Sequence, residues 1–293
     1  MGIQLIVNGI SIGAVYALFA AGFALVFSVL KFSNLAHGGV VSASAYAGFI
    51  FQANINPTPP FWATALFTCF AGMFFTFLVD MCGFYRLRAK HANSLFFFLA
   101  SITFAILIEQ ILIANYGTMM YAFPPLFQPP TMAIFGITFS RLDMTILAIA
   151  VVILAMLAYL IERTRLGLAI RAVAINTRVS QLMGINSSRL ITTTLIIAGF
   201  LAGITGLMLG VKYSVFPALG PSIMLKGLIA SVIGGLGSLS GTIFAAILLG
   251  VVEIICIFFW GAEITPLLLF GVMLVFLLIR PQGIAGRFSH DKA

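Results

Sequence analysis

Few side chains inside the apolar segments of this 293-residue chain could take part in chemistry. Glu109 and Glu253 are the obvious acids within long apolar runs, and His37 lies in a short polar interruption after the first run. No HExxH pair and no GxxxxGK[ST] nucleotide loop occurs in the sequence, and no acid is paired with His37 or His91. The residues therefore disfavour a membrane-embedded enzyme, and they predict no metal site and no nucleotide site in this chain.

The three cysteines give no sign of a disulfide or a metal centre. Cys69, Cys82 and Cys256 stand singly in apolar surroundings, without CxxC spacing and without clustered histidines. Isolated cysteines of this kind usually behave as small buried hydrophobic residues. We interpret all three in that way.

Composition identifies the class of protein that must position these residues. Hydrophobic residues make up 62% of the chain, charged residues 8%, and the mean hydropathy is +1.18, whereas soluble domains are about 25% charged. Because a membrane-spanning helix needs roughly 20 apolar residues, we predict an all-α integral membrane protein, a single polytopic bundle of about eight to nine spans over residues 1–293.

Two interruptions of the apolar pattern are candidates for a translocation path. Asn34 and His37 lie between the first two apolar runs, where they would either line a path or form a turn that orients two helices. The run near residues 223–237 is too short to cross and reaches a bend at Gly234 and Gly235, which predicts a discontinuous or re-entrant helix. Glu253 is a further candidate for the path, and Glu109 has either a path role or a packing role near the outer interface.

A polar island at residues 162–189 interrupts the apolar sequence and has its own pattern. Apolar side chains recur there at steps of four and three, which predicts one short amphipathic helix with Arg171 and Arg178 on one flank and Gly184 at its end. The stripe consists of Leu168, Ala172, Ile175, Val179 and Leu182. This helix would lie on anionic lipid, dock on a cytoplasmic partner or, least favoured for lack of an aromatic anchor, bind a calmodulin-like protein.

The distribution of basic residues indicates on which side of the membrane the island lies. If the island is cytoplasmic, alternation of spans places twelve Lys and Arg inside and three outside, namely Arg141, Lys212 and Lys226. This bias follows the positive-inside rule and accounts for the net charge of +8 without a nucleic-acid partner. The side of the N-terminus depends on whether the short helix crosses.

Four sequence elements together resemble the permease subunits of branched-chain amino acid ABC importers. The island RTRLGLAIRAVAINTRVSQLMGIN resembles the family's cytoplasmic coupling loop, and Asn34-Leu35-Ala36-His37-Gly38 resembles its N-F-A-H-G element. The run 234–241 resembles its G-G-x-G-S/N-x-x-G element, and residues 280–284 resemble its terminal R/M-P-x-G-I/L signature. The four elements occur in the family's order and cover almost the whole chain.

The resemblance implies a division of labour between several subunits. Two cytoplasmic ATP-binding subunits would use ATP and Mg²⁺, while this chain binds no cofactor. A second homologous permease subunit would complete the channel in the bacterial cytoplasmic membrane. An external solute-binding protein would deliver the substrate to it. The coupling residues would be Arg165, Gly167, Arg171, Ala172, Asn176, Arg178 and Gly184. Many relatives carry an acid near Asn176, so no salt bridge to the ATPase is carried over there.

Other functions are distinguished by residue content. An ion-coupled secondary transporter would usually place several acids at mid-membrane, and this chain offers only Glu109 and Glu253, outside any motif. Among importers, close relatives carry urea or short amides, and an apolar pathway suits a neutral amide as well as a zwitterion. The sequence therefore predicts an importer permease for branched-chain amino acids, with a urea or amide permease as the alternative.

Overall fold

The computed structural model describes residues 2–55, 59–90, 92–124, 131–134, 137–280 and 282–285. His91, residues 125–130, 135 and 136, Pro281 and residues 286–293, which include Arg287 and Lys292, lie outside this part of the chain. The described helices are α1 (Gly2–Leu30), α2 (Ala36–Asn54), α3 (Phe61–Val79), the π-helical turn η1 (Asp80–Phe84), α4 (Tyr85–Ala89), α5 (Ser94–Tyr116), α6 (Arg141–Arg163), α7 (Arg165–Ile175), α8 (Thr177–Leu182), α9 (Ser187–Lys212), α10 (Leu219–Gly234), α11 (Leu239–Trp260) and α12 (Thr265–Ile279).

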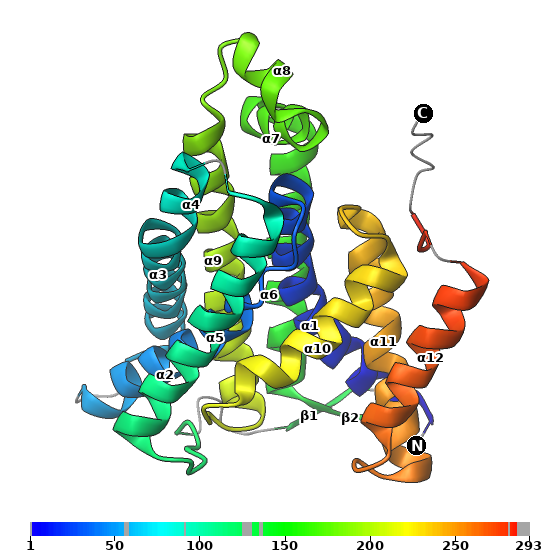
Figure 1. Cartoon of the computed structure of the whole chain (residues 1–293). Helices are drawn as coiled ribbons and strands as arrows, with labels where there is room; N and C mark the ends of the chain where they lie inside the picture. Colours follow the sequence, from blue (N-terminus) through cyan, green and yellow to red (C-terminus); the bar gives the residue numbers. More distant parts are fainter. Residues whose placement is uncertain are drawn as a thin grey trace.

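The predicted polytopic helical fold is confirmed. Six helices are long and apolar enough to span a membrane, and α10 and α12 are shorter apolar helices. The six long helices run roughly between two ends of the molecule, while α2 and α10 lie obliquely to them (Figure 1). One end carries α7 and α8, and we call it the α7–α8 end. The other carries a small hairpin of β1 (Thr131–Ile134) and β2 (Ile137–Ser140), and we call it the hairpin end.

Helix α10 accounts for the predicted short element near residues 223–237. It has 16 residues and crosses the bundle obliquely from the hairpin end, and α11 returns beside it (Figure 1). The chain reverses at Gly235, which has a φ of 101° that L side chains rarely adopt. A short helix that ends in a glycine bend is therefore present, and it begins at Leu219, four residues before the predicted start at Ile223.

Glycines hold the central helices together. On α1, a side chain at Gly9 or Gly13 would collide with the α11 backbone, with a Cβ only 2.7 Å from Val251 Cα or Ile247 Cα. On α9, a Cβ at Gly203 would lie 2.3 Å from the carbonyl oxygen of Thr68 on α3. Since lipid tails are as apolar as the side chains, such close backbone approach is a main source of helix association in membranes.

These contacts reveal an inverted repeat. The pair α1 and α11 corresponds to the pair α9 and α3, because each uses two glycines four residues apart against an antiparallel helix. Each pair packs with a third helix, which gives one triplet of α9, α2 and α3 and an inverted triplet of α1, α10 and α11. Their third helices, α2 and α10, meet near their first turns, where a Cβ at Gly220 would lie 1.8 Å from Gly38 O. There Gly220 N–H donates to Ser42 Oγ, which itself donates to Pro217 O. Inverted repeats of this kind are common in transporters.

The segment from Asp80 to Lys90 is mostly helix, although its four charged residues, taken from the sequence alone, predict a basic cytoplasmic loop. Helix α3 continues through η1 and α4 to Ala89, and Asp80 lies buried within it. The charges of this segment had suggested an exposed loop, but Asp80 and Arg88 neutralise each other. Their ion pair lets the helix continue, which is the reason the prediction was wrong.

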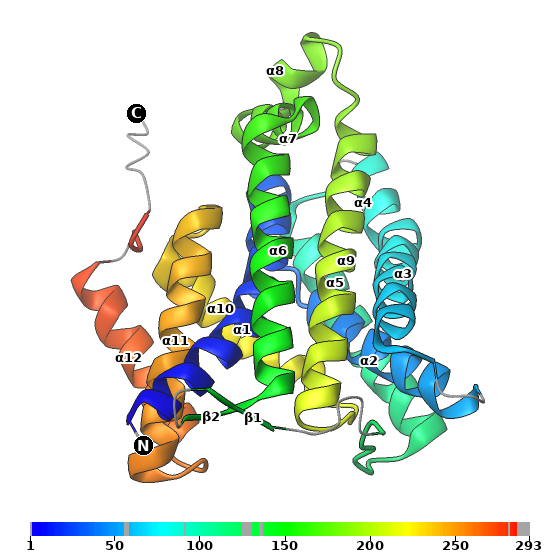
Figure 2. The ribbon, with the colours of Figure 1, turned by 180° about the vertical axis from the view of Figure 1, so that it is seen from behind.

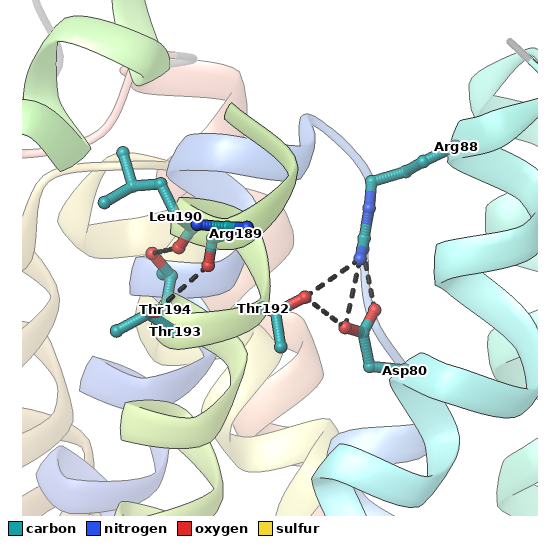
Figure 3. A network of polar contacts seen from close by, with 7 residues as sticks. All are labelled: Asp80, Arg88, Arg189, Leu190, Thr192, Thr193 and Thr194. Carbon is teal, nitrogen blue, oxygen red and sulfur yellow. Dashed lines mark hydrogen bonds and ion pairs between the residues drawn. The ribbon is translucent and has the colours of Figure 1, made fainter. Parts of the chain in front are cut away.

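A polar network ties this extended helix to α9 (Figure 3). Arg88 pairs with both carboxylate oxygens of Asp80, at 2.7 and 3.0 Å, in a bidentate geometry. Thr192 on α9 donates to Asp80 Oδ2 at 2.6 Å and accepts from Arg88 Nη2 at 3.1 Å. Because Asp80 is 2% exposed, its charge depends on these partners.

We expect Gly203→Ala to destabilise the bundle, because its methyl group would push α3 away from α9. Overpacking typically costs about 1–3 kcal/mol, so the melting temperature in detergent should fall by several degrees. Gly271→Ala on α12 is the matched control, since no atom lies within 4 Å of its Cβ position. Equal melting temperatures for the two variants would contradict the close α3–α9 contact.

Asp80→Ala should destabilise the α7–α8 end, because it leaves the Arg88 guanidinium without its counter-ion. Breaking a buried pair costs about 3–5 kcal/mol. The double variant Asp80→Ala/Arg88→Met should recover part of this loss, because no charge is then left unpaired. Denaturant unfolding in detergent measures both, and a double variant less stable than the single one would contradict the role given to the pair.

Candidate functional site

The polar island forms two helices, which corrects the prediction of one continuous amphipathic helix. Helix α7 ends at Ile175 and α8 starts at Thr177, with Asn176 between them in an extended conformation. The side-chain oxygen of Asn176 accepts from the backbone N–H groups of Arg178 (3.0 Å) and Val179 (3.1 Å). Asparagine is a preferred helix N-cap, and this local bond starts a second helix where the periodicity alone suggested continuation.

Gly184 ends the second helix, as predicted. It has a φ of 83°, its N–H donates to Gln181 O, and the next N–H, of Ile185, donates to Ser180 O. This is the usual geometry of a glycine after a helix C-terminus. Asn186 then caps α9 by accepting from Arg189 N–H at 3.1 Å, so the segment enters the next span without a flexible linker.

Gly167 anchors the other end of the island. Thr164 caps α7 by accepting from Gly167 N–H at 3.1 Å. A Cβ at Gly167 would lie 2.3 Å from the carbonyl oxygens of Leu160 and Ile161, so α7 turns back directly on the end of α6. One face of α7 is thus fixed to the bundle, with Ile170 and Val173 each 2% exposed.

The opposite face presents the predicted apolar stripe to the outside. Ile175 and Leu182 are each 87% exposed and Leu168 is 62% exposed. The two helices enclose an open hollow of about 660 Å³, which we call the α7–α8 groove. Its lining consists of Arg165, Leu168, Ala169, Ala172, Ile175, Asn176, Val179, Ser180, Met183 and Ile185. Helices α7 and α8, which line the groove, project from the end of the bundle (Figures 1 and 2). Exposed apolar surface of this kind is typical of interaction sites.

Arg171 and Arg178 do not share one flank of the stripe, because the break at Asn176 separates them. Arg171 Nη2 donates to Glu162 O at 3.4 Å, in a hollow of about 500 Å³ that also contains Lys31. Arg178 lines a different hollow, of about 650 Å³, together with Arg88. Basic side chains thus lie in both hollows.

Asn34 and His37 are enclosed by the bundle. They are 4% and 2% exposed, and neither Asn34 Oδ1 nor His37 Nε2 has a hydrogen-bond partner in the described part of the chain. The His37 ring lies 4.9 Å from the Phe19 ring, and its Nε2 lies 3.0 Å from the Cβ position of Gly22, so α1 closes directly over it. A path role for these two residues stays a prediction.

Gly234 and Gly235 form the packed bend between α10 and α11. A Cβ at Gly234 would lie 2.5 Å from Gly241 C and Thr242 Cα. The terminal motif packs on the same bend, where Ile284 N–H donates to Ile233 O at 2.8 Å and Ala285 N–H to Gly234 O at 3.1 Å. Two of the four motifs are therefore bound to each other, and the bend has a clear packing role.

Glu253 forms a buried ion pair that the sequence analysis missed. Lys226 Nζ lies 2.6 Å from Glu253 Oε1 and 2.8 Å from Tyr16 Oη, which joins α10, α11 and α1. Counting Lys226 with the outer basic residues was wrong, because it lies within α10. The available signal was the occurrence of one cation and one acid in neighbouring apolar helices. Glu253 Oε2 is buried and has no partner among the described residues.

Glu109 stands apart from the other candidates for the path. It lies on α5 with intermediate exposure, and it makes no ion pair or hydrogen bond with the described residues. The five other candidates lie inside the bundle or at the α10–α11 bend. A single chain therefore does not bring the six predicted residues together around one cavity.

The family model that matches this chain and two relatives similar over nearly its whole length are all named as branched-chain amino acid transport permeases. The family model for "Branched-chain amino acid transport system / permease component" matches residues 5–278. The permease protein BraD of the high-affinity branched-chain amino acid transport system of Pseudomonas aeruginosa is 29% identical over 99% of this chain and 97% of its own length. The corresponding LivH protein of Escherichia coli K12 is 28% identical over the same shares.

A relative that matches over a shorter stretch is named for a different substrate. The nucleoside ABC transporter permease protein NupB of Lactococcus lactis is 33% identical over 36% of this chain and 30% of its own length. The family match, in contrast, covers nearly the whole chain, including α1 to α12 almost completely. Together with the apolar spans, it shows that this multi-pass membrane protein belongs to the family of branched-chain amino acid transport permease components.

Proposed function

We propose that this chain is a permease subunit of an ATP-driven importer of branched-chain amino acids in the bacterial cytoplasmic membrane. The observation that carries the proposal is the α7–α8 groove, an apolar surface held outside the membrane bundle on two capped helices. Two ATP-binding subunits would each engage one permease at such a groove. They would bind the ATP and Mg²⁺, and this chain would carry no ATPase site of its own.

The groove suits coupling because both of its ends are fixed to spanning helices. Gly167 joins α7 tightly to α6, and Asn186 starts α9 immediately after the turn at Gly184. A displacement of the groove would therefore move α6 and α9 directly, because no flexible linker separates them from α7 and α8. The Asp80–Arg88–Thr192 network links α9 in turn to α3, so a movement of α9 would also move α3. Rigid-body movement of this kind is a common switching mechanism.

The orientation follows from the proposed partners. With the groove in the cytoplasm, the α7–α8 end contains Arg163, Arg165, Arg171, Arg178 and Arg189, in agreement with the positive-inside rule. The N-terminus of α1 then lies on the outer side with the hairpin (Figure 2). An external solute-binding protein would dock there. A second homologous permease subunit would complete the translocation path, which would have one outer and one inner opening.

The substrate is proposed from the relatives, since the names of BraD and LivH specify branched-chain amino acids. A mostly apolar interior with the Lys226–Glu253 pair suits a solute that has an apolar side chain and balanced charges. Urea and short amides remain the alternative from the sequence, and the nucleoside relative adds a third solute class to test.

Reconstitution tests this function directly. A tag on this chain should recover two ATP-binding subunits and a second permease subunit, as measured by native mass spectrometry. In liposomes with the binding protein, labelled leucine, isoleucine or valine should accumulate only with ATP and Mg²⁺. Competition with urea and with a nucleoside separates the alternatives. Full uptake by this chain alone without ATP would contradict the proposal and favour an ion-coupled carrier.

Substitutions at the groove test the coupling role. Ile175→Asp and Leu182→Asp should each lower ATP-driven uptake at least about tenfold, because an aspartate would be desolvated at an apolar contact. Both side chains are 87% exposed in this chain, so the yield of folded protein should not change.

Leu182→Met is the matched control, because it changes the same 87% exposed position but keeps an apolar side chain of similar volume. It should leave ATP-driven uptake near the wild-type rate. Normal uptake by both aspartate variants would contradict the docking of an ATP-binding subunit at this groove.

A further inference from the structure

The outward surfaces of the spanning helices differ in chemistry. The exposed positions of α3 are apolar, including Trp62, Leu66, Phe67, Phe70 and Phe74, while its threonines Thr64, Thr68 and Thr76 are buried. Helix α12 also exposes only apolar side chains along its length, among them Leu267, Val272, Leu274, Val275 and Leu278. These surfaces are suited to lipid, because they place no polar group in hydrocarbon.

Helices α5 and α10 differ from this pattern. Among the described residues of the membrane-length and shorter apolar helices, counted more than one turn from a helix end, Glu109 and Lys226 are the charged side chains that keep partial exposure. Gln110 next to Glu109 is exposed, and so is Ser222 one turn before Lys226. Both helices lie on the side of the bundle that faces the viewer in Figure 1, whereas α6 and α9 face the viewer in Figure 2.

Glu109 cannot be left in lipid at this position without a large cost. It lies seven residues before Tyr116, the last residue of α5, which places it about 10 Å inside the helix end at 1.5 Å per residue. A charged side chain at the centre of a bilayer costs at least about 2.5–3.5 kcal/mol. No described residue of this chain pairs with Glu109, so a subunit packed against α5 could supply its partner.

The fold itself shows what such a partner can supply. Lys226 lies seven residues after Leu219, the first residue of α10, and α10 starts at the same end at which α5 stops. Its side chain keeps 29% exposure although it pairs with Glu253. The two charges, of opposite sign, therefore lie a similar number of residues from the same end of the bundle. Two subunits with this fold, packed face to face, would bring charges of opposite sign to the same interface.

We propose that the surface formed by α5 and α10 is where the second permease subunit packs, and that this subunit places a positive charge opposite Glu109. This inference rests on the proposed importer and specifies the face by which its two permeases meet. The α3 and α12 surfaces then face lipid. The substrate path would run along the same polar seam.

Photo-cross-linking in the complete transporter tests the surface. Benzoylphenylalanine at Gln110 on α5 or at Leu225 on α10 should yield a covalent permease–permease adduct, identified by mass spectrometry. The same probe at Phe70 on α3 or Val275 on α12, which are 65% and 54% exposed, should yield at least about tenfold less. Equal or larger adduct yields from the α3 and α12 probes would overturn the proposal.

Charge reversal gives a second measurement. Glu109→Lys should reduce the amount of second permease subunit that co-purifies with the tagged chain at least about tenfold, because the lysine would repel the partner's positive charge. Glu109→Gln should reduce it less, because the amide oxygen can still accept a hydrogen bond. Glu263→Lys, at an exposed acid in the turn between α11 and α12, is the matched control and should not change recovery. Full recovery with Glu109→Lys would count against the proposal.

The outcome for the surface is separable from the outcome for the importer. Native mass spectrometry of the unmodified complex shows first whether ATP-binding subunits and a second permease are present. If they are present and cross-linking comes from α3 or α12, the importer stands and the α5–α10 surface is wrong. If no second permease is present, both proposals are overturned.

Discussion

Close approach of helix backbones at glycine is the constraint on which the rest of this structure depends. In lipid there is little hydrophobic gain from pairing two apolar helices, so contact area and backbone proximity must hold them together. Gly9 and Gly13 let α1 meet α11, and Gly199 and Gly203 let α9 meet α3. These two contacts place α2 and α10 between them, and they fix the positions from which α6 and α9 carry the α7–α8 groove.

Much of the fold was predictable because it follows from local sequence properties. Apolar runs of sufficient length gave the spans, the glycine bend after α10 gave the short helix, and Gly184 gave the end of α8. Small residues recur every four positions along α1, at Gly9, Gly13, Ala17 and Ala21, which favours an interior helix, and α1 is largely buried. None of these features needs information about distant parts of the chain.

The errors arose where a distant partner decides the outcome. Asp80 was expected in a loop because its pairing with Arg88 and Thr192 cannot be recognised from hydropathy. Lys226 was counted outside because its partner Glu253 lies 27 positions later. Asn176 was placed inside a helix because periodicity ignores the capping bond of a side chain. The inverted repeat was missed for the same reason, since only the contacts reveal it.

Two of the three ion pairs among the described residues, Asp80–Arg88 and Lys226–Glu253, have positions with a mechanical consequence. In one triplet, Asp80, Arg88 and Thr192 join α3 to α9 toward the α7–α8 end. In the inverted triplet, Lys226, Glu253 and Tyr16 join α10, α11 and α1, with Glu253 seven residues from the hairpin end of α11. Each half of the protein thus carries one latch, and the two latches lie toward opposite faces of the membrane. In the proposed importer, a rocking motion that opens one face would strain one latch and leave the other closed, so the arrangement that builds the bundle would also oppose opening at both faces at once.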